Sequence, residues 1–509
     1  MDYPRLLPAL CGPRFSGAVL VAALMLLQFD RGANAAELGI NLANPTYWSG
    51  ERSLTNLMAG GEWQSSRQSQ SGWTAFDPAR LDAEGNIIAL EPGETANTML
   101  VPPERAYGPK SVRVRCKWEG SGAVQPGGSV QGFAAGGTNG FAFYWQAATD
   151  VKPKGVWISV TKTVKADPIR RIDCREADAD ENAAFSPDFV SFLAGFKVLR
   201  YLDWQNANAN ATVRWASRTR PESQFQASTQ GMAVEHLVAL ANQVGADPWF
   251  TMPWNADEDY IRHFAEYVRG NLDPRRKVYV ELSNEVWNYI FAATVQAEKE
   301  GLEAKLSGDR FQAALFRYAE KSTWMLKIWT EIFAQNPERL VRVVATQHGL
   351  AWAAEQILGF RDTAQYVDAL ATAPYFGHAT LEEARAGIKS LDDHFAFLDA
   401  DIDRTIQHAV DVKKVAVQYG KRYLAYEAGQ HIVSAADTAT VAALNRDARM
   451  QALYTKYLQA WQSRLGDLMV MFNTTSSVSQ YGAWGIREYA GQPVEQTPKL
   501  RAILEFLKH

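Results

Sequence analysis

Two short segments of this chain end in a carboxylate in a way that suits hydrolytic chemistry. Segments 278–288 and 422–431 each begin with β-branched or aromatic residues and then reach a glutamate, Glu285 in the first and Glu427 in the second. If both runs are strands of one parallel sheet, the two glutamates lie at the same end of that sheet. Two carboxyl groups facing each other across a sugar-binding cleft are the groups needed to hydrolyse a glycosidic bond.

The elements that would position these glutamates form a regular series. From residue 197 onward, strand-like runs alternate with amphipathic helical segments. The runs are 197–203, 247–254, 278–285, 340–346, 367–375, 422–427 and 467–473. With the short run that begins at Gly39 they make eight, as in a (β/α)8 barrel, whose active site lies at the carboxyl ends of the strands. The alternative is a doubly wound sheet, which would not necessarily bring both glutamates together.

The region 50–183 has a different character, because it is rich in Gly, Ser and Pro and its ordered parts alternate with a period of two. Such runs are 111–118, 141–145 and 156–161. Short strands separated by turns predict a β-sandwich-like module. We interpret it as an insert between a first barrel strand in 36–49 and the rest of the barrel in 184–509. The alternative is an independent N-terminal domain that includes the Gly39 strand.

Two motifs resemble those of a known group of enzymes. Leu282-Ser-Asn-Glu-Val-Trp287 resembles the strand-four acid/base motif of clan A glycoside hydrolases, in which an Asn precedes the acid/base Glu. Ala425-Tyr-Glu-Ala-Gly429 resembles the strand-seven nucleophile motif of the same clan. In our strand count the two glutamates end strands four and seven, as the resemblance requires. It covers the barrel, about residues 37–48 and 184–509, and identifies no family within the clan.

The resemblance implies a retaining mechanism, in which the two carboxyl groups lie roughly 5–5.5 Å apart. Glu427 would be the nucleophile, Glu285 the acid/base, and Asn284 would hydrogen-bond the sugar 2-hydroxyl. This chemistry requires one carboxyl to be protonated while the other is ionised. The structural alternatives are a helix-capping role for Glu285 and an ordinary salt bridge for Glu427.

The resemblance also implies supporting residues at other strand ends. Arg200 ends strand two and would keep the nucleophile ionised, with an ordinary ion pair as the alternative. His348 follows strand five, and Tyr375 and His378 follow strand six. These three side chains would contact the nucleophile or the sugar, or else occupy satisfied positions in the core.

Three tryptophans are candidates for stacking on a sugar ring. Trp254, Trp287 and Trp484 lie at or after strands three, four and eight, and packing in the core is the alternative for each. Clan members often place a Trp after strand eight, but Trp484 comes only after a long loop. Glu281 shares a strand face with Glu285 and would need a partner inside the barrel, since a lone buried charge is costly.

Composition and motif searches exclude several other functions. The 509 residues carry a formal net charge of −4, and without a basic stripe nucleic-acid binding is not indicated. There is no His-Glu-x-x-His, no Cys-x-x-Cys and no phosphate-binding Gly-x-x-x-x-Gly-Lys-Ser/Thr loop, so neither a metal nor another cofactor is expected. A Gly-x-Ser-x-Gly elbow is also absent, which argues against a serine esterase.

The N-terminal residues 1–35 have the pattern of a signal peptide. Arg5 and Arg14 precede a ten-residue apolar run, 18–27, which is too short to span a bilayer. Ala33-Asn-Ala35 is a small-x-small cleavage site, so we expect a mature chain that starts near Ala36 and is secreted or periplasmic. An uncleaved anchor is the alternative. No later segment reaches transmembrane length.

The cysteines leave two possibilities open. Cys11 lies in the predicted signal peptide, so the mature chain would keep Cys116 and Cys174. In an exported protein these two can form a disulfide, or they can remain as buried free thiols.

The sequence therefore predicts a retaining glycoside hydrolase that acts on a polysaccharide or oligosaccharide, with a β-linkage favoured over an α-linkage. One alternative is a non-catalytic glycan-binding or surface-assembly protein on a degenerate barrel, for which aromatic residues alone would suffice. Another is a transglycosylase with the same catalytic residues. The sugar, the linkage, endo or exo action, the role of the insert and the oligomeric state stay open.

Overall fold

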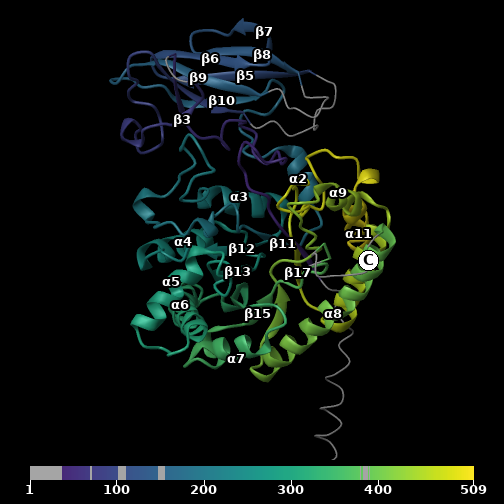
Figure 1. The fold of residues 1–509 in the computed structure, drawn as a ribbon. Coiled ribbons are helices and arrows are strands. Elements are labelled where there is room, and N and C mark those ends of the chain that lie inside the picture. The colour runs from purple at the N-terminus through teal and green to yellow at the C-terminus, as the bar shows by residue number, and fades with distance from the viewer. Residues whose placement is uncertain are drawn as a thin grey trace, which may run out of the picture.

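A computed structural model describes residues 37–68, 71–100, 111–146, 155–378, 380–381, 388 and 390–508. The predicted signal peptide lies outside the described residues. The described chain forms an α/β barrel and a β-rich module (Figure 1). Within this part of the chain, no helix combines the length and apolar character needed to cross a membrane.

Eight parallel strands close into a barrel. In barrel order they are β1 (Leu38–Asn41), β11 (Val198–Arg200), β12 (Asp247–Met252), β13 (Val278–Leu282), β14 (Leu340–Ala345), β15 (Ala369–Thr372), β16 (Arg422–Ala425) and β17 (Met469–Met471). The last strand pairs with the first, with Ile40 opposite Met471. The predicted (β/α)8 fold class is confirmed, and a doubly wound sheet is excluded because that sheet has open edges.

Helices cover the outside of the barrel. They are α2 (Pro187–Leu193), α3 (Val234–Val244), α4 (Glu258–Asn271), α5 (Ala292–Glu303), α6 (Arg310–Ile332), α7 (Ala351–Gly359), α8 (Leu391–Gln418), α9 (Thr438–Arg446), α10 (Arg449–Arg464) and α11 (Pro498–Phe506). Helix α4 illustrates how sequence sets such a helix. Asp257 caps its N-terminus by accepting from the Tyr260 backbone N–H, and Ile261, Phe264 and Val268 bury one apolar face.

The barrel interior is apolar at one level and polar at the next. Alternate residues of each strand point inward, and Val198, Trp249, Tyr279, Leu424 and Val470 belong to the same internal apolar cluster. Two residues further along β11 and β13, the same inward face carries charged side chains. The barrel thus presents a polar layer on top of a packed core, at the carboxyl ends of its strands.

The β-rich module consists of two antiparallel sheets. The five-stranded sheet has the order β3-β2-β4-β9-β6, and its strands are β2 (Gln64–Arg67), β3 (Thr74–Ala75), β4 (Glu94–Met99), β6 (Gly122–Gly128) and β9 (Val156–Thr163). The four-stranded sheet has the order β10-β5-β8-β7, with β5 (Ser111–Glu119), β7 (Val130–Ala135), β8 (Gly140–Gln146) and β10 (Arg170–Glu176). Their inner faces share one hydrophobic core, separate from that of the barrel, so the sandwich-like character is confirmed.

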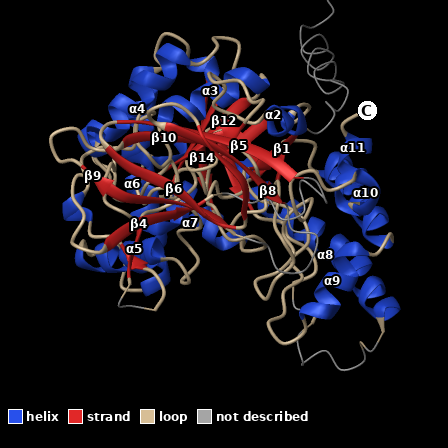
Figure 2. Ribbon diagram, turned by 90° about the horizontal axis from the view of Figure 1, so that it is seen from above, coloured by secondary structure: helices blue, strands red, loops and turns tan. Residues whose placement is uncertain are grey.

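The module is continuous with the chain between β1 and β11 and lies over the end of the barrel (Figures 1 and 2). The chain enters and leaves it through adjacent segments, since Thr55 N–H donates to the Ala184 carbonyl and Ser186 N–H to the Ser53 carbonyl. The loop after β11 meets the module, because Gln226 N–H donates to the Ala59 carbonyl. The module therefore borders the carboxyl end of the barrel.

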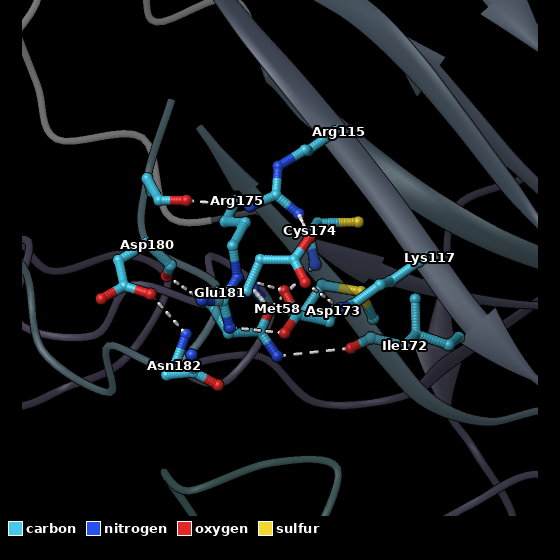
Figure 3. Close-up of polar contacts among 12 residues, drawn as sticks. Met58, Arg115, Lys117, Ile172, Asp173, Cys174, Arg175, Asp180, Glu181 and Asn182 are labelled. Atoms are coloured by element: carbon cyan, nitrogen blue, oxygen red, sulfur yellow. Dashed lines mark hydrogen bonds and ion pairs between the residues drawn. The ribbon is translucent and has the colours of Figure 1, made fainter. Parts of the chain in front are cut away.

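A disulfide joins Cys116 of β5 to Cys174 of β10, which face each other in the antiparallel register. Of the two possibilities that the sequence leaves open, the structure has the disulfide. Figure 3 shows charged side chains around it, including Arg115 and Lys117, which both contact Glu181. These contacts link the sheet to the segment that returns to the barrel.

Candidate active site

The polar layer at the carboxyl end of the barrel is organised around Arg200. This arginine, the last residue of β11, is fully buried and contacts two carboxylates. Its Nη1 donates to Glu427 Oε1 at 2.8 Å, and its Nε and Nη2 donate to Glu281 Oε1 at 2.9 and 2.5 Å. It also donates to the side-chain oxygens of Asn41 at 3.0 Å and Asn284 at 2.9 Å. Because the guanidinium is planar and fully engaged, it holds these groups in a fixed arrangement.

Strand alternation explains how these residues meet. Val198 and Arg200 share the inward face of β11, and Tyr279 and Glu281 share that of β13. Arg200 is therefore the partner that Glu281 needs inside the barrel. The guanidinium carbon of Arg200 lies 5.0 Å from the ring centroid of Tyr426, a cation–π contact.

Glu285 stands in a tight turn just after β13. Its φ is +46° and that of Ser283 is +57°, a left-handed conformation that non-glycine residues seldom adopt. The turn is stabilised because Thr294 Oγ1 donates to the Glu285 carbonyl at 3.1 Å. The Glu285 carboxylate accepts from Tyr426 Oη at 3.0 Å and from Asn288 Nδ2 at 2.9 Å. A strained backbone held by side-chain contacts is typical of functional positions.

Glu427 follows β16 and is almost completely buried. Its Oε1 accepts from Arg200, and its Oε2 accepts from Tyr375 Oη at 3.0 Å. Glu427 therefore contacts a cation, whereas the hydrogen-bond donors to Glu285 are neutral side chains. The structure thus brings together Glu285, Glu427, Arg200 and Tyr375, all selected from the sequence.

The two glutamates differ in their preference for a proton. Burial and the charge of Glu427 raise the pKa of Glu285 to about 7, against the smaller opposing effects of Asn288 and Tyr426. The pKa of Glu427 is also raised, because burial outweighs the lowering effects of Arg200 and Tyr375. When the pair shares one proton, the direct contact with Arg200 favours the ionised form of Glu427 and leaves the proton on Glu285.

Asn284 lies within this layer, and the two predicted histidines contact other side chains. The Asn284 amide donates to Asn208 at 3.2 Å. His348 contacts Thr372 at 3.3 Å and lies beside His408, and burial lowers its pKa to about 4. His378 is exposed and its ring centroid lies 4.8 Å from that of His431.

The three tryptophans predicted to stack on a sugar lie in different environments. Trp484 lies at the site, with its ring centroid 5.3 Å from Tyr375 and 4.6 Å from His431. Trp254 is 0% exposed in the barrel core, with the Lys321 ammonium 4.4 Å from its ring centroid, so it offers no stacking surface. The expectation that Trp254 stacks on a sugar is therefore corrected: it packs in the core, because residues of α6, distant in sequence, cover its ring. Trp287 is half-buried and packs against the same core.

Sequence reasoning missed four side chains of this region, and each had a weak signal. Tyr426 immediately precedes Glu427, and Asp203 follows Arg200 by three residues. Burial and the charge of Glu427 raise the pKa of Asp203 to about 7. Asn208 lies in an Asn-rich loop after β11, and His431 closes the segment that contains Glu427. Only their positions after barrel strands distinguish these residues from ordinary loop residues.

Metal binding has no candidate cluster in the described part of the chain. There, no group of three or more His, Cys, Asp or Glu side chains is arranged to hold a metal ion. The carboxylates at the barrel mouth instead have Arg200, two tyrosines and an asparagine as partners.

Comparison with known proteins finds remote structural similarity. No family model and no curated protein sequence matches the chain. A family 51 α-L-arabinofuranosidase from Bifidobacterium longum matches with a TM-score of 0.41 and 12% identity, covering 64% of this chain and 68% of that one. The GH51 arabinofuranosidase from Xanthomonas axonopodis pv. citri gives a TM-score of 0.39 and 12% identity over 60% of this chain. The match spans 63% of the Xanthomonas protein, slightly under two thirds.

A β-glucosidase from Thermotoga maritima matches with a TM-score of 0.36 and 13% identity, covering 63% of this chain and 85% of that one. The matched structures are clan A glycoside hydrolases. At these identities and TM-scores the similarity concerns general architecture alone. The chemistry of the site therefore has to be inferred from its own residues.

Proposed function

We propose that this protein is a retaining glycoside hydrolase. One observation carries the proposal: of two buried carboxyl groups at the mouth of a closed barrel, Glu427 contacts Arg200, whereas Glu285 does not and has its pKa raised by the charge of Glu427. This asymmetry supports one ionised and one protonated carboxyl in the same site near neutral pH, as double displacement requires.

In the proposed first step, Glu427 attacks the anomeric carbon and the bond from that carbon to the leaving oxygen breaks. Glu285 gives its proton to the leaving oxygen. In the second step, Glu285 takes a proton from water, the water oxygen attacks the anomeric carbon, and Glu427 is released. Arg200 and Tyr375 support the departure of Glu427 as a carboxylate, because both donate hydrogen bonds to it.

Sugar release from a panel of soluble polysaccharides tests this proposal. Glu427→Ala and Glu285→Gln are each expected to reduce kcat by at least about a thousandfold on a natural substrate. Glu320→Gln is a matched control, because Glu320 lies on the outer helix α6, where it pairs with Arg317 of the same helix and with Arg361 in the turn after α7. Full activity of both site variants would refute the assignment.

Azide rescue tests the individual roles on an activated aryl glycoside. Azide should restore turnover of Glu285→Gln with a product of unchanged anomeric configuration. With Glu427→Ala it should give the inverted glycosyl azide, because azide then attacks in place of the missing nucleophile. Identical product configurations from the two variants would contradict the assigned roles.

The alternatives predict other outcomes in the same experiments. A transglycosylase would convert the substrate into longer chains when an acceptor sugar is present. A glycan-binding protein would retain a polysaccharide without cleaving it.

We also propose that the chain is exported. The N-terminal pattern supports export, and the Cys116–Cys174 disulfide is compatible with an oxidising compartment.

A further inference from the structure

Four of the exposed aromatic side chains follow barrel strands at the mouth of the barrel. The exposed large hydrophobic residues include six aromatic ones: Trp48, Phe133, Tyr144, Tyr289, Trp352 and Tyr481. Phe133 and Tyr144 belong to the β-rich module. The other four each follow the carboxyl end of a barrel strand, namely β1, β13, β14 and β17. Large exposed aromatics gathered around one site mark a binding surface more often than scattered ones do.

The first group, which we call the β17/β1 rim, comprises Trp48 and Tyr481. They are 64% and 73% exposed. The two loops pack together, because Ala490 N–H donates to the Gly50 carbonyl at 2.7 Å. Trp484 connects this rim to the catalytic centre, since its Nε1 donates to the Tyr481 carbonyl at 2.6 Å and its ring lies beside Tyr375.

The second group, which we call the β13/β14 rim, comprises Tyr289 and Trp352. They are 44% and 42% exposed, and Phe311 lies between them with ring centroids 6.4 and 6.1 Å away. Tyr289 Oη donates to Glu298 Oε2 at 2.7 Å, which orients its ring. Asn288, the neighbour of Tyr289, contacts Glu285, so this rim is continuous with the acid/base glutamate.

Barrel topology places the two rims on opposite sides of the site. In the closed eight-stranded order, β1 is four strands from β14, and β17 is four strands from β13. Four steps around eight strands is the largest possible separation. A ligand that contacts both rims must therefore pass over the barrel mouth and across Glu285 and Glu427.

We infer that the site binds one continuous polysaccharide chain along both rims and cleaves it internally, an inference that rests on the proposed hydrolase function. The apolar C–H faces of successive sugar rings pack on aromatic side chains, whose rigidity keeps the entropic cost low. Glu285 protonates the leaving group, so the chain beyond the scissile bond lies on the β13/β14 rim. The retained part of the chain lies on Trp484 and the β17/β1 rim.

The test compares Trp352→Ala, Trp48→Ala and the control Tyr144→Ala, an exposed aromatic of the module. The substrate is the polysaccharide that wild-type protein cleaves in the panel, together with its end-labelled oligosaccharides. Wild type should lower the viscosity of the polymer steeply for each new reducing end. Each rim variant should lower kcat/KM on long chains about tenfold, and Tyr144→Ala should not.

The two rim variants should also shift the cleavage position along a labelled oligosaccharide in opposite directions, because they weaken opposite ends of the bound chain. A short aryl glycoside should be turned over equally by Trp352→Ala and wild type. If wild type releases only small sugars from chain ends, or if the rim variants match wild type on long chains, internal cleavage is refuted and the hydrolase assignment stands. If no glycan is cleaved, both fail.

Discussion

Each of the two glutamates accepts a hydrogen bond from a different tyrosine. Tyr426 donates a hydrogen bond to Glu285, and Tyr375 donates one to Glu427. Each bond favours the ionised form of its own carboxyl and so lowers that group's pKa. The proposed reaction needs opposite ionisation states, so these tyrosines provide a matched pair for testing the roles.

We expect kcat/KM to fall at alkaline pH as Glu285, with its pKa raised to about 7, loses its proton. Tyr426→Phe removes a donor to the ionised form, so the alkaline limb should move to higher pH. Tyr375→Phe should raise the pKa of Glu427 and move the acidic limb to higher pH, with kcat lower by roughly 10- to 100-fold. The measurement is the pH profile of kcat/KM for wild type and both variants. Movement of the same limb in both variants would contradict the assignment.

Much of this residue-level arrangement follows from the sequence. Glu285 and Glu427 are recognisable because each ends a strand-like run, and Arg200 is recognisable for the same reason. The partner of Glu281 could not be predicted, because it depends on how β11 and β13 are staggered around the barrel. The burial of Trp254 could not be predicted either, because Lys321, which covers its ring, comes from a helix far away in sequence.

At the level of elements, alternation was a reliable guide to type and a poor guide to length. The structure has all eight predicted barrel strands, but β17 spans only Met469–Met471 within the predicted 467–473. The outer residues of such runs belong to loops that carry the functional side chains. At strand ends, the backbone groups of polar residues form hydrogen bonds with loops. A period-two hydrophobic pattern does not reveal where the strand ends and these loop contacts begin.

The disulfide gives the module a test of its own. Cys116 and Cys174 are 58 positions apart, and closing a loop of that length in the unfolded chain contributes about 4 kcal/mol of stability. Replacing both cysteines by Ala should therefore lower the unfolding temperature of the module, as followed by calorimetry. A reductant should lower the unfolding temperature of the wild-type module by a similar amount and should not change that of the double variant. If the unfolding curve of the wild-type protein is the same with and without reductant, a stabilising role of the disulfide is contradicted.

At the level of the whole molecule, the insert occupies one boundary of the site. Its entry and exit segments are hydrogen-bonded to each other, so it extends from the barrel as a unit. Its position over the carboxyl end of the barrel was not predictable from composition (Figure 2). That position depends on contacts such as the one between Ile172 N–H and the Gln224 side chain, at 2.9 Å.

Export of the chain is a prediction at this scale. Expressed in a Gram-negative host, the protein should appear in the periplasm or the medium with an N-terminus near Ala36, as N-terminal sequencing would show. Leu26→Arg places a charge in the apolar run and should block processing, whereas Leu26→Ile should not. Processed protein from the Arg variant, or unprocessed wild type in the cytoplasm, would contradict the prediction.

The place of β1 in the barrel has a consequence for biosynthesis. Asn41 contacts Arg200, 159 positions later, and donates to the Met471 carbonyl, 430 positions later. Contacts this distant form only after most of the chain has left the ribosome, whereas the module can assemble from much closer segments. The polar layer around Arg200 is therefore completed last. A nascent chain that stops before β17 carries both glutamates but no assembled site.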